Sequence, residues 1–349
     1  MAGINFANQT LWTGDNLPVL RGMNSECVDL IYLDPPFNSN RNYEAPIGSE
    51  AAGAAFKDAW TLNDIDLYEH GELADRNPAV YAVIGAARQA HGKGMQAYLI
   101  MMSVRLLEMY RVLKTTGCLY LHCNQFASHY LKLLLDSLFG KINFITEIIW
   151  NYGTPSGGRS SGKKPVKTHD TILVYAKQYG KHLYNRQFTP YSEKYVTNWF
   201  RHEDDDGRRY RTRKRKNKIV RQYLDQSPGM PLSTVWTDIM QLSSRRGWFP
   251  NVKSEETGYP TQKPLALLDR IVKASSNEGD VILDPFCGCA TALVAADRLE
   301  RRWAGIDLSP LAINLVDKRI RADQGPIFSG CNALTAPLYI VRDAILSVL

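Results

Sequence analysis

The chain has 349 residues, of which 44% are hydrophobic and 22% charged, the balance of an ordinary globular protein. This length suffices for one large α/β domain with insertions or for two domains. No apolar run reaches the roughly 20 residues that a membrane-spanning helix needs. The N-terminus lacks the basic segment and apolar core of a secretory signal, so we expect a cytoplasmic protein. The net charge of +7 favours a polyanionic partner.

The six cysteines do not form a recognisable ligand pattern. Cys287 and Cys289 are separated by one residue, and Cys118 and Cys123 by four. Neither spacing is typical of paired zinc ligands. We therefore predict no metal site and no disulfide framework, but reduced thiols buried in the protein.

The N-terminal part of the chain predicts the order strand, helix, strand. A short strand over Thr10–Thr13 leads to Asp15, an amphipathic helix follows over Asn16–Met23, and the second strand is the apolar run Val28–Leu33. Asp15 is expected to cap the helix, to serve a ligand at the edge of the sheet, or to do both.

The second strand ends abruptly at Asp34-Pro35-Pro36-Phe37. Proline lacks an N–H and fixes φ, so this pair stops the sheet ladder and stiffens the turn. Ligands of open α/β sheets bind at the carboxyl ends of strands. The stretch therefore predicts either an ordinary proline turn with a capping acid or a rigid ligand site. Such a site would combine one carboxylate, fixed backbone carbonyls and one aromatic ring.

Residues 38–95 have weak periodicity and predict a mobile functional insertion. After them the pattern returns to alternating helices and strands. Helices are predicted at Tyr98–Val112 and Ala127–Phe139, and strands at Gly117–His122, Phe144–Trp150 and Thr171–Tyr175. This order is typical of a parallel sheet covered by helices.

A dense basic run distinguishes residues 180–260 from the rest of the chain. It holds nine cationic residues: Arg208, Arg209, Arg211, Arg213, Lys214, Arg215, Lys216, Lys218 and Arg221. So many positive charges in a short span can neutralise several phosphates. We therefore predict that this run binds nucleic acid, the alternative being a solvated charged loop.

A second strand–turn–helix unit lies towards the C-terminus. The strand Asp280–Asp284 leads into a turn containing Gly288, and the strand Arg302–Asp307 ends in another acid. A glycine turn lets the backbone approach a ligand, and an acid about 20 residues further on is placed to bind ribose hydroxyls. The turn lacks the dinucleotide pattern, and Asp284 can pair with a cationic amino group. The unit therefore favours an adenosyl ligand without pyrophosphate over plain capping acids. Helices are predicted around it at Leu265–Ser275, Ala292–Leu299 and Leu311–Ala322.

Together, Asp34-Pro35-Pro36-Phe37 and Asp284-Pro285-Phe286-Cys287-Gly288-Cys289-Ala290-Thr291 resemble two motifs of the amino DNA methyltransferases. The first is similar to that family's catalytic (D/N/S)-P-P-(Y/F) tetrapeptide. The second is similar to its D-P-F-x-G-x-G-T cofactor motif, with Cys289 and Ala290 where serine and glycine are usual. The catalytic motif comes first and the basic run lies between the two, as in the circularly permuted β class. The likeness covers nearly the whole chain.

The resemblance implies a fold and a domain organisation. The implied fold is the Rossmann-like α/β fold of S-adenosylmethionine-dependent methyltransferases, with a seven-stranded, mostly parallel sheet, one antiparallel strand and helices on both faces. We predict a catalytic half at 1–180, a target-recognition insertion at 181–258 and a cofactor-binding half at 259–349. The implied partners are double-stranded DNA, a second copy of the chain in a homodimer and a restriction-system protein. No membrane partner is expected.

The resemblance also implies methyl transfer from S-adenosylmethionine to the exocyclic N6 of an adenine flipped out of duplex DNA. Asp34 and the backbone carbonyl of Pro35 would accept the amine N–H groups, expose the nitrogen lone pair and aim it at the sulfonium methyl. Pro36 would stiffen the turn and Phe37 would stack on the base. The C5-cytosine class needs a nucleophilic cysteine, typically after a proline, and no Pro-Cys pair occurs here.

Further residues receive roles from the resemblance. Those expected around the cofactor are Asp15, Lys263, Asp284, Phe286, Gly288, Thr291, Asp307 and Leu308. Those expected on the DNA are Asn38, Arg41, Tyr43, Arg208, Arg211, Arg213, Lys214, Arg215 and Lys216. Asp307 is expected to bind the ribose hydroxyls, and Asp15 the adenine region of the cofactor.

Three alternatives stay open at this point. An N4-cytosine methyltransferase of the same family would use the same geometry around the amine. A catalytically silent nucleic-acid-binding protein could share the scaffold. The methyl acceptor could also be RNA or a protein, since the basic run does not distinguish RNA from DNA. The recognition sequence is not predicted.

Overall fold

The computed structural model describes residues 3–37, 41–44, 55–58, 61, 67–153, 163, 165–216, 218–242, 255–309, 315–316, 318–320 and 340–343. The chain divides into two compact units, a main unit (Met1–Tyr184 with Thr234–Leu349) and a small unit (Asn185–Ser233). The small unit is narrower than the predicted 181–258 insertion, because β13 (Val235–Trp236) pairs with β6 (Phe144–Asn151) in the main sheet.

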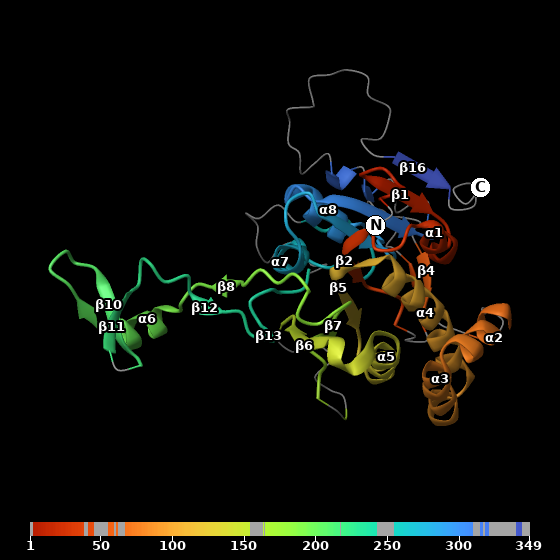
Figure 1. The fold of residues 1–349 in the computed structure, drawn as a ribbon, viewed down its shortest axis with the longest axis horizontal. Coiled ribbons are helices and arrows are strands. Elements are labelled where there is room, and N and C mark those ends of the chain that lie inside the picture. The colour runs from red at the N-terminus through yellow and green to blue at the C-terminus, as the bar shows by residue number, and fades with distance from the viewer. Residues whose placement is uncertain are drawn as a thin grey trace, which may run out of the picture. The chain divides into compact units, whose positions relative to one another are not determined.

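The main unit is built on one mixed sheet whose described strands number nine (Figure 1). Their order is β13-β6-β7-β5-β2-β14-β15-β1-β16. The remaining bounds are β1 (Thr10–Thr13), β2 (Val28–Leu33), β5 (Leu113–Cys123), β7 (His169–Ala176), β14 (Val281–Asp284), β15 (Arg302–Asp307) and β16 (Ile340–Asp343). Among the described strands of this sheet, β7 runs antiparallel to both its neighbours and all other pairs are parallel. The mostly parallel α/β sheet is thus confirmed. The count differs from the predicted seven, with β13 and β16 at the two edges.

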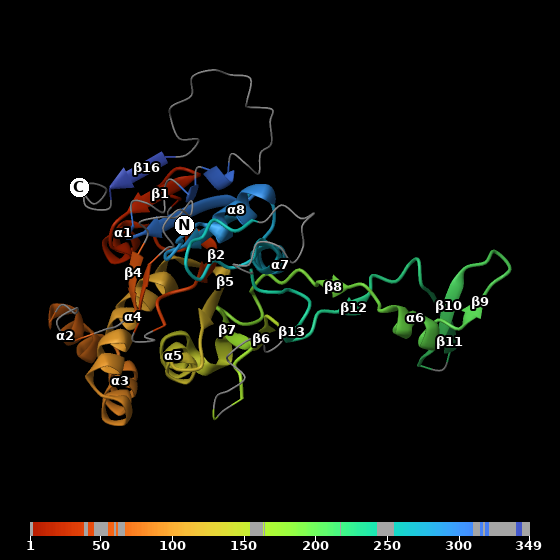
Figure 2. The ribbon, with the colours of Figure 1, turned by 180° about the vertical axis from the view of Figure 1, so that it is seen from behind.

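Helices cover both faces of the sheet (Figures 1 and 2). One face carries α1 (Asn16–Gly22), α3 (Pro78–His91), α4 (Lys93–Val112) and α5 (Ser128–Leu135), and the other carries α7 (Leu265–Ser275) and α8 (Thr291–Arg298). Side chains alternate along a strand, so Leu119 and Leu121 join the core under the first group while Tyr120 points the other way. The Tyr120 hydroxyl lies 2.7 Å from Ser275 Oγ at the end of α7, which ties that helix to the sheet.

Two helices in residues 38–95 were not predicted from the sequence. In α3, the Asn77 side chain caps the first turn by accepting a hydrogen bond from Val80 N. Val80, Ile84 and Ala87 recur at helical spacing and are buried in the core, so this helix packs against the main unit. The mobility of the segment stays a prediction. The described elements of the segment are α2 (Leu67–Arg76), α3, and the antiparallel strands β3 (Arg41–Glu44) and β4 (Ala55–Asp58).

The bounds predicted for the other described helices and strands agree with the structure to within about five residues. After α5 the helix continues as a π-helical turn, η2 (Asp136–Gly140), and a 3-10 turn, η3 (Lys141–Asn143). Of the predicted helix at 311–322, residues 315–316 and 318–320 are described, and they are helical. The five described cysteines are buried and form no disulfide. Among the described helices, none is long and apolar enough to cross a membrane.

The sheet order gathers acidic residues at one edge. Strands β2, β14, β15 and β1 are adjacent and parallel, so their carboxyl ends meet, bringing together Asp34, Asp284, Asp307 and Asp15. Asp170 reaches the same edge from the other direction, because β7 is antiparallel and has its first residues there. This edge of the main sheet is where the predicted ligand site lies.

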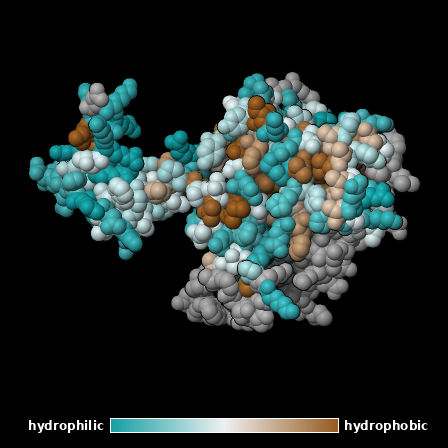
Figure 3. Space-filling view, turned by 90° about the horizontal axis from the view of Figure 1, so that it is seen from below, coloured by the Kyte–Doolittle hydropathy of each residue, from teal (hydrophilic) through white to brown (hydrophobic). Residues whose placement is uncertain are grey.

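The small unit consists of short antiparallel pairs and one helix. Its elements are β8 (Phe188–Thr189), α6 (Glu193–Trp199), β9 (His202–Glu203), β10 (Arg209–Arg215), β11 (Lys218–Tyr223) and β12 (Met230–Pro231). The basic run therefore forms a β-hairpin, in which Arg215 is opposite Lys218 beside the turn. The surface of this unit is mostly hydrophilic (left in Figure 3).

We predict that Gly117→Ala lowers the free energy of unfolding by about 1–3 kcal/mol. A Cβ at Gly117 would lie 2.8 Å from the backbone oxygen of Asp29 and 2.7 Å from Leu113 Cδ1, and backbone cannot easily give way. Urea denaturation measures the change. The control is Gly85→Ala in α3, where a Cβ meets nothing within 4 Å. It should leave stability equal or raise it by about 0.5–1 kcal/mol. Equal losses in both variants would contradict the close packing at Gly117.

Candidate active site

Asp34 and Lys263 form a buried ion pair at the acidic edge of the sheet. Lys263 Nζ donates a hydrogen bond to Asp34 Oδ2 and a second one, of 3.2 Å, to the backbone oxygen of Thr261. The lysine and aspartate side chains are only 9% and 17% exposed. The other carboxylate oxygen, Asp34 Oδ1, is buried and has no hydrogen-bond partner among the described residues. An unsatisfied buried acceptor is unusual and marks a place that a ligand donor can complete.

Phe37 lies beside a buried polar chain that the sequence analysis missed. The ring of His122 is fully buried, with its centroid 6.0 Å from that of Phe37. Its Nδ1 lies 3.2 Å from the Tyr32 hydroxyl, and its Nε2 lies 3.4 Å from Asp170 Oδ2. Lys167 donates to the other oxygen of Asp170. These hydrogen bonds hold the His122 ring in place beside the Phe37 ring.

Asp170 remains charged in spite of its burial. Burial raises the pKa of this carboxyl, but the hydrogen bond and charge of His122, with the charges of Lys263 and Lys167, outweigh it and hold the pKa below its usual range. The carboxylate is therefore a permanent acceptor for the imidazole of His122 at neutral pH.

Asp284 and Asp307 end neighbouring strands and are held by backbone N–H groups. Asp307 Oδ2 accepts from Gly288 N at 2.8 Å, and Asp284 Oδ1 accepts from Phe286 N at 3.1 Å. Burial raises the pKa of Asp284 well above its ordinary value; the N–H of Phe286 opposes this, whereas the nearby charges of Asp34 and Asp307 add to it. Burial likewise raises the pKa of Asp307. Two buried acids that resist ionisation fit a ligand that brings positive charge.

The turn between β14 and α8 is tightly built. Gly288 has φ +51°, and a Cβ there would lie 3.0 Å from the ring of Tyr259. Ala290 also has a left-handed conformation, with φ +59°, at the start of α8. Glycine is the residue best suited to such angles, so this is a strained position for an alanine. The close packing leaves room only for backbone at Gly288.

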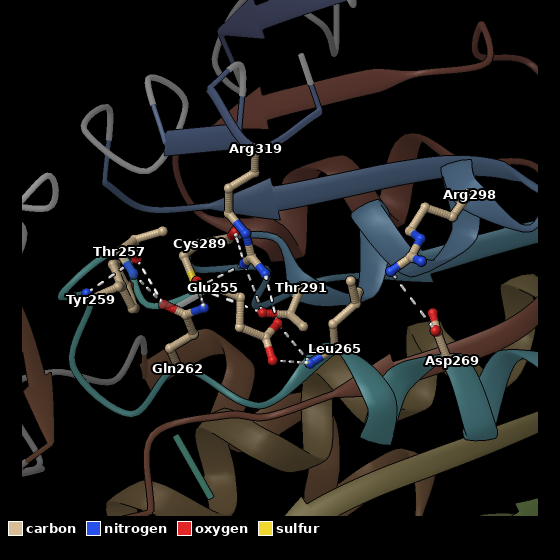
Figure 4. Close-up of polar contacts among 10 residues, drawn as sticks. All are labelled: Glu255, Thr257, Tyr259, Gln262, Leu265, Asp269, Cys289, Thr291, Arg298 and Arg319. Atoms are coloured by element: carbon tan, nitrogen blue, oxygen red, sulfur yellow. Dashed lines mark hydrogen bonds and ion pairs between the residues drawn. The ribbon is translucent and has the colours of Figure 1, made fainter. Parts of the chain in front are cut away.

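Arg319 anchors this turn from outside (Figure 4). Its Nη1 donates to the backbone oxygen of Cys289 at 2.7 Å and to Thr291 Oγ1 at 2.8 Å. Its Nη2 lies 3.9 Å from Glu255 Oε2. Glu255 in turn accepts from Leu265 N at 3.0 Å, at the start of α7. One arginine thus joins the turn after β14 to the segment that carries Lys263.

Asp15 has the capping role that was one of its two predicted roles. Its carboxylate accepts from Leu17 N at 2.9 Å and from Arg105 Nη2 at 2.8 and 2.9 Å. Arg105 also donates to Asn16 Oδ1, and Asn16 Nδ2 donates to the backbone oxygen of Pro285 at 2.7 Å. The end of β1 is therefore fixed to the turn after β14. A contact of Asp15 with the cofactor stays a prediction.

The other residues predicted around the ligand have different environments. Phe286 is partly buried against the core, and Thr291 is buried at the start of α8. Leu308 follows Asp307 and is 77% exposed. Of the residues predicted near the DNA, Asn38 lies outside the described residues, and Arg41 and Tyr43 are described only as backbone of β3.

The basic run of the small unit contains two kinds of cation. Arg211 is 7% exposed; its guanidinium lies 4.9 Å from the ring centroid of Phe200 and donates to the Tyr195 hydroxyl at 2.6 Å. Arg208 pairs with Asp225 at 2.8 Å. Both arginines are thus engaged by groups of the small unit itself, and a contact of either with DNA stays a prediction. The remaining predicted DNA contacts are all exposed towards the end of the hairpin: Arg213, Lys214, Arg215 and Lys216.

Comparison with known proteins identifies the family. Residues 28–318 match the model of the N6/N4 methyltransferase family, described as DNA methylase. The chain belongs to this family. It is therefore an S-adenosylmethionine-dependent DNA methyltransferase, and the acidic edge is its candidate active site.

Relatives that match most of this DNA methyltransferase share about a quarter of its residues. It is 25% identical to the type II methyltransferase M.EcaI of Enterobacter cloacae, over 92% of this chain and 71% of the relative. It is 27% identical to the DNA adenine methyltransferase YhdJ of Escherichia coli K12, over 90% of this chain and 84% of the relative. A crystal structure of M1.HpyAVI with SAM shares 17% identity over 89% of this chain and 98% of that one, with a TM-score of 0.47.

We predict that Asp284→Asn stabilises the ligand-free methyltransferase at alkaline pH while weakening S-adenosylmethionine binding. A carboxyl whose pKa is raised by folding stabilises the fold below its unfolded pKa, ordinarily 3.8, and loses that contribution as the pH rises towards the folded pKa. The amide avoids this loss. The variant should therefore gain about 1 kcal/mol or more in free energy of unfolding near pH 8, and little near pH 4.

Urea denaturation at both pH values and calorimetric titration with S-adenosylmethionine measure the two effects. The control is Asp205→Asn, because Asp205 is exposed in the small unit. A variant that is less stable than wild type at alkaline pH would contradict the assigned cost of burying Asp284.

Proposed function

We propose that this methyltransferase transfers the methyl group of S-adenosylmethionine to the exocyclic N6 of an adenine flipped out of duplex DNA. The observation that carries the proposal is the state of Asp34. Its Oδ2 is engaged by Lys263, whereas its Oδ1 is buried without a partner among the described residues. An amine N–H is the donor that completes this acceptor, and a base reaches it only after leaving the duplex stack.

The residues around Asp34 fit this chemistry. An exocyclic amine is a poor nucleophile because its lone pair is delocalised into the ring. Hydrogen bonds from its N–H groups to Asp34 Oδ1 and to the backbone oxygen of Pro35 would localise that lone pair and orient it for in-line attack. When bound, S-adenosylmethionine supplies a methyl group on a positively charged sulfur. As the N–C bond forms and the S–C bond breaks, the nitrogen would become cationic and lose one proton, which we propose that Asp34 Oδ1 accepts.

Adenine is proposed over cytosine on two grounds. The tetrapeptide contains aspartate and phenylalanine, and in this family that combination is more typical of the adenine-specific enzymes. The Escherichia coli relative is named a DNA adenine methyltransferase. The alternative is the N4 amine of cytosine, which would meet the same acceptors. Digestion of methylated duplex to nucleosides, followed by mass spectrometry, separates the two, and N4-methylcytosine would overturn the adenine assignment.

We predict that Asp34→Ala lowers the rate of methyl transfer to duplex DNA at least about 100-fold, because the amine loses its charged acceptor. S-adenosylmethionine affinity should stay within a few-fold of wild type, as measured by calorimetry. Near wild-type transfer by the variant would refute the role of Asp34. If the wild-type protein itself transfers no methyl group to duplex DNA, RNA or protein, the alternative of a silent nucleic-acid-binding protein is favoured.

We further propose that the hairpin of the small unit binds the DNA. A two-stranded β-ribbon fits the major groove, and the cations near its turn are exposed. Replacing Arg213, Lys214, Arg215 and Lys216 with glutamine should weaken DNA binding and reduce the slope of log K against log salt by up to about 0.9 for each phosphate that is no longer neutralised. The control replaces Lys194 and Arg201, exposed cations of the same unit, with glutamine. An unchanged slope in the hairpin variant would place the DNA elsewhere.

The proposed partners besides DNA are a second copy of the chain and a restriction enzyme. The second is supported by the names of relatives, since M.EcaI and the Haemophilus parainfluenzae protein M.HpaI are type II methyltransferases. Sedimentation of the purified protein tests the homodimer. Sequencing of methylated bases in cells that express it identifies the recognition site and shows whether it matches a restriction site.

A further inference from the structure

We infer that Lys263 is a positioning residue for methyl transfer: its ammonium holds Asp34 Oδ2 so that Oδ1 alone faces the target amine. From the family resemblance, this lysine was instead expected to contact the cofactor. The inference rests on the proposed function, because it assigns how the acceptor of that reaction is held in place.

The first support is that the lysine ammonium already donates hydrogen bonds to groups of the protein. Its Nζ donates to Asp34 and to the backbone oxygen of Thr261, and it lies 5.5 Å from the ring centroid of Phe37. The residue is only 8% exposed. The ammonium therefore contacts the acid and the aromatic ring of the same tetrapeptide, which is the side of the site that receives the base.

The second support is that the backbone of Lys263 is held from both sides. Thr261 has φ +64°, a strained angle for threonine of the kind found at functional sites. Gln262 accepts from Thr257 N at 2.9 Å and donates to the backbone oxygen of Glu255 at 2.7 Å. Pro264 follows directly as the N-cap of α7. The constrained backbone fixes where the lysine side chain begins, and its burial limits the positions open to the ammonium.

The third support is electrostatic. The charge of Lys263 lowers the pKa of Asp170 and opposes the rise in the pKa of Asp284, so it acts on acids on both sides of Asp34. Removing one partner of a buried ion pair leaves the other as an uncompensated charge. Without the lysine, Asp34 would lose the interaction that fixes Oδ2. The carboxylate could then rotate, and Oδ1 would no longer point in a defined direction.

The two roles of Lys263 predict different kinetics. A cofactor ligand would act on the affinity for S-adenosylmethionine. A positioning residue acts on the rate at saturating cofactor, and acts through Asp34. We therefore expect Lys263→Met to lower the single-turnover rate on duplex DNA about 100-fold, with S-adenosylmethionine affinity within about threefold of wild type. Lys263→Arg should retain more activity than Lys263→Met. The control is Lys273→Met, an exposed lysine on α7, which should behave as wild type.

Chemical rescue separates positioning from a general structural role. Lys263→Ala leaves space for a small primary amine, so ethylamine in an amine-free buffer should restore part of the rate in proportion to its concentration. Tetramethylammonium, which has charge but no N–H donor, should restore none. Equal effects of the two cations would overturn the inference.

A double-mutant cycle with Asp34→Asn keeps the inference testable if the alanine variant does not fold. If Lys263 acts through Asp34, Lys263→Met should add little to the loss already caused by Asp34→Asn. Multiplicative losses, or a lower S-adenosylmethionine affinity with an unchanged saturating rate, would overturn the inference. Absence of transfer by the wild-type protein would count against the proposed function itself, whereas full activity of Lys263→Met counts only against the role of this lysine.

Discussion

A carboxylate buried at the edge of a sheet needs a compensating charge, and this constraint organises the site. Asp34, Asp284, Asp307 and Asp170 meet at one edge, and Lys263 is the cation that contacts the first of them. Burying an ionised carboxylate costs free energy unless it is paired or hydrogen-bonded, and otherwise the group becomes neutral. Asp34 is paired with Lys263, Asp307 accepts from a backbone N–H, and the raised pKa of Asp284 favours its neutral form. What remains is an edge with an excess of acid, which is the environment that a cationic methyl donor completes.

The register of the sheet brings the parts of this site together from distant positions in the chain. Leu30 is opposite Ile282 in the parallel pair of β2 and β14, so the motifs that begin at Asp34 and Asp284 lie at neighbouring strand ends. Contacts outside the sheet then fix the turns: Asn16 holds the backbone of Pro285, and Arg319 holds that of Cys289. Backbone oxygens accept both bonds, so the turn after β14 is held independently of most of its own side chains.

The strands that end in acids could be predicted from the sequence, because an apolar run followed by Asp-Pro or Asp-Leu is a recognisable pattern. The places of His122 and Asp170 in the site could not be predicted, since periodicity gives the position of a strand in the sequence but not its direction in the sheet. Asp170 reaches the site only because β7 is antiparallel. The contacts of Arg211 were likewise not predictable, because several other cations lie near it in the sequence. Only the fold shows that its guanidinium is buried against Phe200 and Tyr195.

The pairing of Lys263 with Asp34 links the two motifs in one more way. Lys263 belongs to the segment that Arg319 and Glu255 join to the turn after β14, yet its ammonium contacts the acid after β2. A cation bound beside Asp284 would act on the same group of carboxylates as Lys263 does, because electrostatic interactions between buried charges are weakly screened. In the proposed mechanism, Lys263 therefore acts both on Asp34, the acceptor of the amine, and on Asp284, beside the methyl donor. Neither half of the site would be electrostatically independent of the other.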